Sequence, residues 1–152
     1  MRAALFGPDG VEYSAEQDEH CAQVLYDTAT WLARRGRTPI TILDGRTFAR
    51  GRDVEHLLAT VTADDGRVVF VECTADEAVL RDRLERDARA GVHVAANRDA
   101  SLLDHWLARR EELHVPGGVA HVTLDTGRVP LDAQVAIVRE TVARLDASRR
   151  GS

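Results

Sequence analysis

Acidic and arginine side chains follow several short apolar segments of this chain, where they could bind an anionic ligand. Asp44 and Arg46 come directly after one such segment, and Asp125 and Thr126 come directly after another. If the segments are strands of a parallel sheet, their carboxyl ends meet at one edge, where such sheets bind ligands. Arginine is well suited to phosphate and carboxylate groups because its planar guanidinium donates paired hydrogen bonds. The residues at this edge are therefore the first candidates for a ligand site.

Each of these residues also has a purely structural interpretation. Asp44 could orient a substrate hydroxyl or a magnesium-bound water, as phosphoryl transfer requires, or it could cap the turn that it forms with Gly45. Arg46 could contact a substrate anion or lie in solvent. Asp125 and Thr126 could form the turn that leads to Pro130.

A second group of candidates lies on one predicted helix, which carries Arg81, Arg83 and Arg86. Residues three or four apart share a helix face, whereas residues two apart diverge. Arg83 and Arg86 are therefore the pair expected to face the same point. Alternatively, the arginines form ordinary surface ion pairs with the acidic residues between them, and each such pair contributes little to stability.

All 20 basic residues of the chain are arginine. The glycine-rich turn G-x-x-x-x-G-K-[ST], whose lysine holds the phosphates of a bound nucleotide, therefore has no counterpart in this sequence.

Helical and strand-like patterns alternate along the 152 residues. Ser14 and Gln17 form a predicted capping box, Gly36 is a predicted helix stop, and Thr74 with Glu77 forms a second predicted capping box. The expected helices cover 14–36, 48–61, 74–91, 101–113 and 131–145, and the expected strands 38–43, 68–71 and 119–124. Residues 91–100 are expected to be a loop. This alternation predicts an α/β fold with a parallel sheet and flanking helices.

Composition limits the class of protein. Hydrophobic residues make up 44% and charged residues 30% of the chain, which is typical of one globular domain. The net charge of −5 argues against a nucleic-acid partner. No apolar run is long enough to cross a membrane, and Cys21 and Cys73 show neither zinc-site nor disulfide-framework spacing. We expect a cytoplasmic protein without a metal site of its own.

Five motifs, taken in order, carry a family resemblance. They are Ile-Leu-Asp-Gly-Arg-Thr-Phe (42–48), Val-Val-Phe-Val-Glu-Cys-Thr (68–74), Arg-Asp-Arg-Leu-Glu-Arg-Asp (81–87), Gly-Val-His-Val-Ala-Ala-Asn-Arg (91–98) and Val-Thr-Leu-Asp-Thr (122–126). The order resembles small-molecule P-loop kinases, a group of predicted kinases often labelled AAA-family ATPases and related to adenylylsulfate, gluconate and zeta-toxin kinases. The resemblance runs from about Arg2 to Leu145.

The resemblance implies a three-layer P-loop fold, ATP with Mg²⁺ as cofactors, and a small-molecule acceptor. It also implies roles for single residues. Catalytic roles fall to Asp44, Arg83, Arg86 and Arg98, substrate binding to Arg2 and Arg46, and nucleotide binding to Asp125 and Thr126.

The sequence departs from this family at its beginning. The family starts with a strand, the phosphate-binding loop and a helix, and all three would lie upstream of Met1. The expected domain is therefore a truncated kinase-like domain over 1–147 with a frayed tail over 148–152. Three explanations could account for the missing segments: the chain starts too late, another chain donates the strand, or the sheet is rearranged. An unfilled sheet would also encourage association into homo-oligomers.

Two functions are compatible with these features of the sequence. The first is an ATP-dependent phosphotransferase that acts on a small molecule, in a chain that lacks its phosphate-binding loop. The second is a non-catalytic relative that serves as a scaffold or binds a partner.

Overall fold

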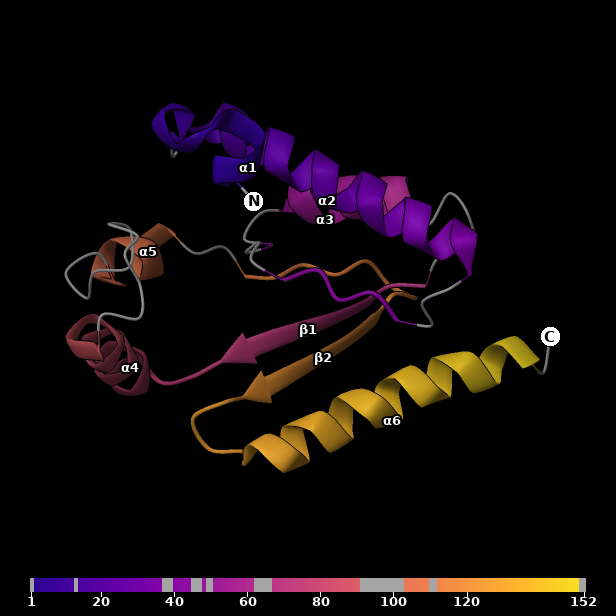
Figure 1. Cartoon of the computed structure of the whole chain (residues 1–152). Helices are drawn as coiled ribbons and strands as arrows, with labels where there is room; N and C mark the ends of the chain where they lie inside the picture. Colours follow the sequence, from indigo (N-terminus) through magenta and orange to yellow (C-terminus); the bar gives the residue numbers. More distant parts are fainter. Residues whose placement is uncertain are drawn as a thin grey trace. The chain divides into compact units, whose positions relative to one another are not determined.

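The computed structural model describes residues 2–12, 14–36, 40–44, 48, 51–61, 67–90, 103–109 and 112–150. In chain order its elements are α1 (Arg2–Phe6), the 3-10 helix η1 (Pro8–Gly10), α2 (Ala15–Arg35), α3 (Gly51–Val61), β1 (Val69–Thr74), α4 (Glu77–Ala90), α5 (Leu103–Arg109), β2 (Ala120–Asp125) and α6 (Leu131–Arg150) (Figure 1). The chain divides into two compact units, Met1–Val68 and Val69–Ser152.

The longest helix of the first unit, α2, begins and ends where its sequence signals predict. The Ser14 hydroxyl accepts a hydrogen bond from the Gln17 N–H, and Gly36 adopts the left-handed conformation at φ 60°. The Gln17 side chain reaches back to the preceding segment, because its Nε2 donates to the Gly10 carbonyl and its Oε1 accepts from the Glu12 N–H. The bond to Ser14 satisfies an N–H that a helix start leaves without an intrahelical partner. The two side-chain bonds of Gln17 tie the segment before α2 to the helix.

Helices α2 and α3 pack against each other and form the core of the first unit. Tyr26 and Val54 are almost fully buried there, and the Tyr26 ring meets the His56 ring edge-on at 5.3 Å. The His56 ring also lies 2.9 Å from a Glu19 carboxylate oxygen and 2.8 Å from the Gln23 side-chain oxygen. Polar contacts thus flank the apolar interface and fix how the two helices align.

The second unit is built on the parallel pair β1 and β2, with α6 packed on it (Figure 1). The register aligns Val69 with Ala120 and Thr74 with Asp125. Phe70 and Leu124 are its buried strand residues, each only 4% exposed. Both strands end at the same edge, so the β1–α4 and β2–α6 connections emerge together.

The expected three-layer parallel sheet of the P-loop type is wrong. Within the described residues the fold is mostly helical, and its sheet has only the two strands β1 and β2. Residues 40–43, the described part of the strand expected at 38–43, are irregular, and Ile42 is 84% exposed. An apolar, β-branched segment becomes a strand only when neighbours bond its backbone and cover its side chains.

Most local predictions are confirmed. The helices α2, α3, α4, α5 and α6 and the strands β1 and β2 lie where the sequence patterns place them. The capping role of Thr74 is wrong, because this residue ends β1 and its hydroxyl donates to the Leu124 carbonyl. Helix α6 continues to Arg150, past Asp146, where fraying was expected.

None of the helices in the described ranges combines the length and the apolar character that crossing a bilayer requires.

Candidate functional site at the carboxyl ends of the strands

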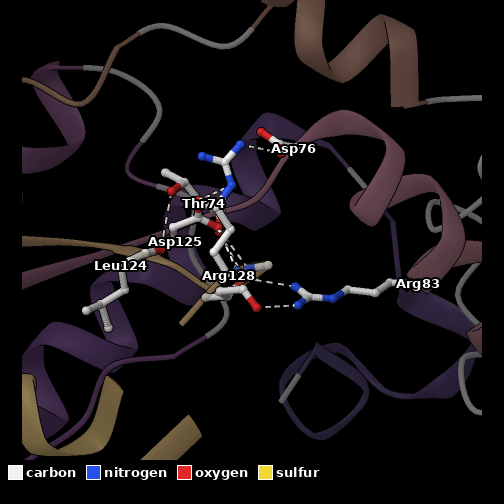
Figure 2. Close-up of polar contacts among 8 residues, drawn as sticks. Thr74, Asp76, Arg83, Leu124, Asp125 and Arg128 are labelled. Atoms are coloured by element: carbon white, nitrogen blue, oxygen red, sulfur yellow. Dashed lines mark hydrogen bonds and ion pairs between the residues drawn. The ribbon is translucent and has the colours of Figure 1, made fainter. Parts of the chain in front are cut away.

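Two threonines join the ends of β1 and β2. The Thr126 N–H and the Thr126 hydroxyl both donate to the Thr74 carbonyl, at 2.7 and 2.9 Å. In return the Thr74 hydroxyl donates to the Leu124 carbonyl at 3.2 Å. The backbone bond extends the parallel ladder by one residue past β2, and the side chains fix the two connections against each other (Figure 2).

Arg83 comes from α4 and binds the same loop. Its Nη1 donates to the Thr126 hydroxyl at 2.9 Å, and its Nη2 donates to the Thr126 carbonyl at 2.7 Å. Figure 2 shows the guanidinium reaching this loop with two parallel bonds. Such a forked arrangement holds a planar guanidinium in one orientation. Arg83 therefore fastens α4 to the end of β2.

Asp125 organises the turn after β2. Its Oδ1 accepts from the N–H groups of Gly127 and Arg128, at 2.9 and 3.1 Å, which is the way an aspartate stabilises a tight turn. Arg128 then spans the two connections, because its Nη2 lies 2.9 Å from Asp76 and its Nε lies 3.4 Å from Asp125. The hydrogen bond to Asp76 is the main cause that raises the pKa of Arg128, and the charges of Asp76 and Asp125 add to it.

The other two candidate arginines of α4, Arg81 and Arg86, have different partners. Arg81 contacts Glu77 at 2.9 Å and Asp104 at 2.7 Å, which links α4 to α5. These hydrogen bonds, first that of Glu77, raise the pKa of Arg81. Arg86 pairs with Asp82 of its own helix at 2.7 Å, and both side chains are well exposed.

Of the residues predicted to form the site, the structure brings together Arg83, Asp125 and Thr126. It does not bring Arg86 to this loop, since Arg86 lies in its surface pair with Asp82. Asp44 and Arg2 belong to the unit Met1–Val68, where Asp44 is exposed in an irregular segment and Arg2 begins α1. Arg46 and Arg98 lie outside the described residues.

Sequence reasoning missed two members of the strand-end network, Asp76 and Arg128. The segment Asp125-Thr-Gly-Arg128 carried a usable signal, since Asp followed two residues later by Gly is typical of an aspartate-stabilised turn. The pairing of Asp76 with Arg128 had no local signal, because the two residues are far apart in the sequence and meet only through the parallel register.

No set of three or more His, Cys, Asp or Glu side chains within the described ranges is placed to hold a metal ion. The acidic groups at the strand ends already accept hydrogen bonds from the chain itself, Asp125 from two backbone N–H groups and Asp76 from Arg128.

Comparison of the chain with protein-family models, with curated proteins and with solved structures finds no match.

Proposed function

We propose that this chain is a non-catalytic scaffold that acts by binding a protein partner. The observation that carries the proposal is that Arg83 and Arg128, the arginines at the ends of the strands, are already bonded to other residues of the same chain. Arg83 gives two hydrogen bonds to Thr126, and Arg128 bridges Asp76 and Asp125. A guanidinium that must leave two good hydrogen bonds to reach a ligand loses much of the benefit of that contact.

Exposed apolar side chains in the second unit support the proposed binding of a protein partner. Leu131 and Val135 of α6 are 71% and 47% exposed, and Val71 of β1 is 38% exposed. Val71 lies in register with Val122, so the two share one face of the sheet. Large apolar side chains left in solvent are the part of this unit that a protein partner could cover.

The phosphotransferase activity implied by the family resemblance stays a prediction. The described residues at the strand ends fit ATP with Mg²⁺ poorly, because Asp125 stabilises its own turn and Arg83 is bonded to the loop that would border the adenine. The activity would require Arg83 and Arg128 to exchange their present partners for phosphate oxygens.

Thermal denaturation with and without ATP and Mg²⁺ tests the proposal. A ligand that binds only the folded state, at about 100 times its dissociation constant, stabilises that state by about 2.7 kcal/mol. We expect millimolar ATP with Mg²⁺ to leave the melting temperature unchanged relative to Mg²⁺ alone. A rise in the melting temperature that an Arg83→Met variant abolishes would overturn the proposal and favour the phosphotransferase.

A further inference from the structure

A large aromatic side chain of α2 is left in solvent. Trp31 is 55% exposed, and it is the largest of the exposed apolar residues in the described part of the chain. Tryptophan is on average one of the more deeply buried residue types, because its ring has a large apolar area. Trp31 lies outside the core of the first unit, since the buried residues of its helix are Cys21, Ala22, Tyr26 and Ala29.

The guanidinium of Arg35 lies over this ring. Its central carbon is 4.8 Å from the centroid of the Trp31 ring, within the range of a cation–π contact. A guanidinium can make this contact while its five N–H donors stay available for a carboxylate. No carboxylate of the described residues pairs with Arg35, in contrast to Arg86 and Arg128. Arg35 is therefore a cation that can bind an anionic group without leaving an ion pair.

An open hollow lies beside the ring. Its walls are formed by Asp27, Thr30, Trp31 and Arg34 of α2 and by Thr60 of α3. The Thr30 hydroxyl donates to the Thr60 carbonyl at 3.5 Å, which joins the two walls. Both helices belong to the first unit, so this unit alone forms the hollow. An apolar side chain of a partner that enters the hollow would cover part of the Trp31 ring.

Charged residues follow one another along this side of α2. Arg34 and Arg35 lie in the last turn of the helix, and Asp27 lies about one turn before Trp31. A helix C-terminus carries the equivalent of about half a negative charge, which the full charge of Arg35 outweighs. A carboxylate of a partner is therefore expected at the Arg35 end of this surface, away from Asp27.

We propose that Trp31, Arg35 and the hollow beside them bind a protein segment in which an acidic residue adjoins an apolar one. This inference rests on the proposed partner-binding function and names the docking surface and the chemistry of the partner. Arg35 binds the carboxylate, and the apolar side chain lies in the hollow against Trp31. Tryptophan and arginine are among the residues that contribute most to protein interfaces. The net charge of −5 repels an extended polyanion, so a short acidic protein segment fits this surface better than a nucleic acid does.

Fluorescence anisotropy tests the proposal with a labelled peptide that alternates aspartate with leucine, titrated with the full chain. A second peptide, with lysine in place of every aspartate, has the same apolar side chains and the opposite charge. We expect the aspartate peptide to bind at least about tenfold more tightly than the lysine peptide, a difference of about 1.4 kcal/mol. A labelled single-stranded oligothymidylate tests the nucleic-acid alternative and should not bind.

Two variants assign the binding to this surface. Trp31→Ala removes the exposed ring, and Arg35→Met keeps most of the aliphatic stem but removes the charge. Each should weaken binding of the aspartate peptide by at least about tenfold. Arg89→Met is the matched control, because Arg89 is also an exposed arginine in the last turn of a helix; this variant should bind the peptide like the wild type.

Failure of the aspartate peptide to bind would overturn the proposal, and so would equal binding of the two peptides or binding of the oligothymidylate. Unchanged binding by Arg35→Met, or by a folded Trp31→Ala variant, would show that the peptide binds elsewhere and would refute the proposed surface. If Trp31→Ala fails to fold, Arg35→Met decides. These outcomes are separate from those of the nucleotide experiment. A chain that binds no peptide and is not stabilised by nucleotide loses only this inference, whereas stabilisation by ATP that Arg83→Met abolishes removes the scaffold function itself.

Discussion

Arginines of the same helix have different roles in this protein, and their neighbours decide which. Arg83 and Arg86 lie one turn apart on α4, a spacing that predicts a shared site. Arg83 instead makes two bonds to the loop after β2, while Arg86 forms an exposed pair within its own helix. Helical spacing shows that two side chains share a face, but not what that face meets.

Replacing Arg83 tests this difference at the residue scale. Arg83→Met keeps most of the aliphatic stem and removes the hydrogen bonds to the part-buried Thr126. We expect it to lower the free energy of unfolding by about 1–3 kcal/mol, the usual cost of breaking bonds to a charged donor. Urea denaturation followed by circular dichroism measures the change.

Arg86→Met on the same helix is the control for that experiment. It removes one exposed i,i+4 pair, so the free energy of unfolding should change by no more than about 0.5 kcal/mol. Equal, small effects of both replacements would show that the Arg83 bonds contribute nothing to stability, and would return Arg83 to the candidates for ligand binding.

At the scale of elements, the sequence signals were reliable where both partners of a bond lie within a few residues. Ser14 caps α2, and Gly36 ends it in the left-handed conformation, as their positions predict. Thr74 and Glu77 carry the same capping pattern, yet Thr74 bonds to Leu124 across the sheet. A competing partner brought in by the parallel register changed the role of Thr74, and no local pattern shows such a partner.

Two glycine replacements test the helix ends. At Gly36 φ is 60° and an added Cβ would touch no atom within 4 Å, so any cost of Gly36→Ala comes from the backbone conformation alone. A non-glycine residue in the left-handed region costs about 1–2 kcal/mol, and we expect Gly36→Ala to destabilise the protein by about 1 kcal/mol in urea denaturation.

Gly51→Ala is the matched case, because an added Cβ there also has open space and Gly51 begins α3 with an ordinary backbone conformation. This change should leave the protein as stable as the wild type or stabilise it by up to about 1 kcal/mol. Destabilisation of similar size at both glycines would mean that helix termination at Gly36 has no special requirement.

At the scale of the whole molecule, sequence patterns identified most elements but not how they assemble. Residues 38–43 have the β-branched composition of a strand, and their described part is irregular and exposed. The same limit applies to α6, whose apolar face over 131–145 reads as uniform in the sequence. In the structure Val138 and Leu145 are half-buried, whereas Leu131 and Val135 are exposed. Helical periodicity gives the direction of an apolar face, while burial depends on what lies opposite each turn.

The last prediction compares a buried leucine with an exposed one. Leu124 of β2 is 4% exposed, and Leu131, at the start of α6, is 71% exposed. Leu124→Ala removes buried methyl groups and leaves a cavity, so we expect a loss of about 2–5 kcal/mol in the free energy of unfolding. Leu131→Ala makes the same chemical change at the surface and should alter that free energy by less than about 0.5 kcal/mol. Urea titrations of both variants measure the two values. A cost at Leu131 comparable to that at Leu124 would show that Leu131 is covered in solution, as a partner bound to this part of α6 would do.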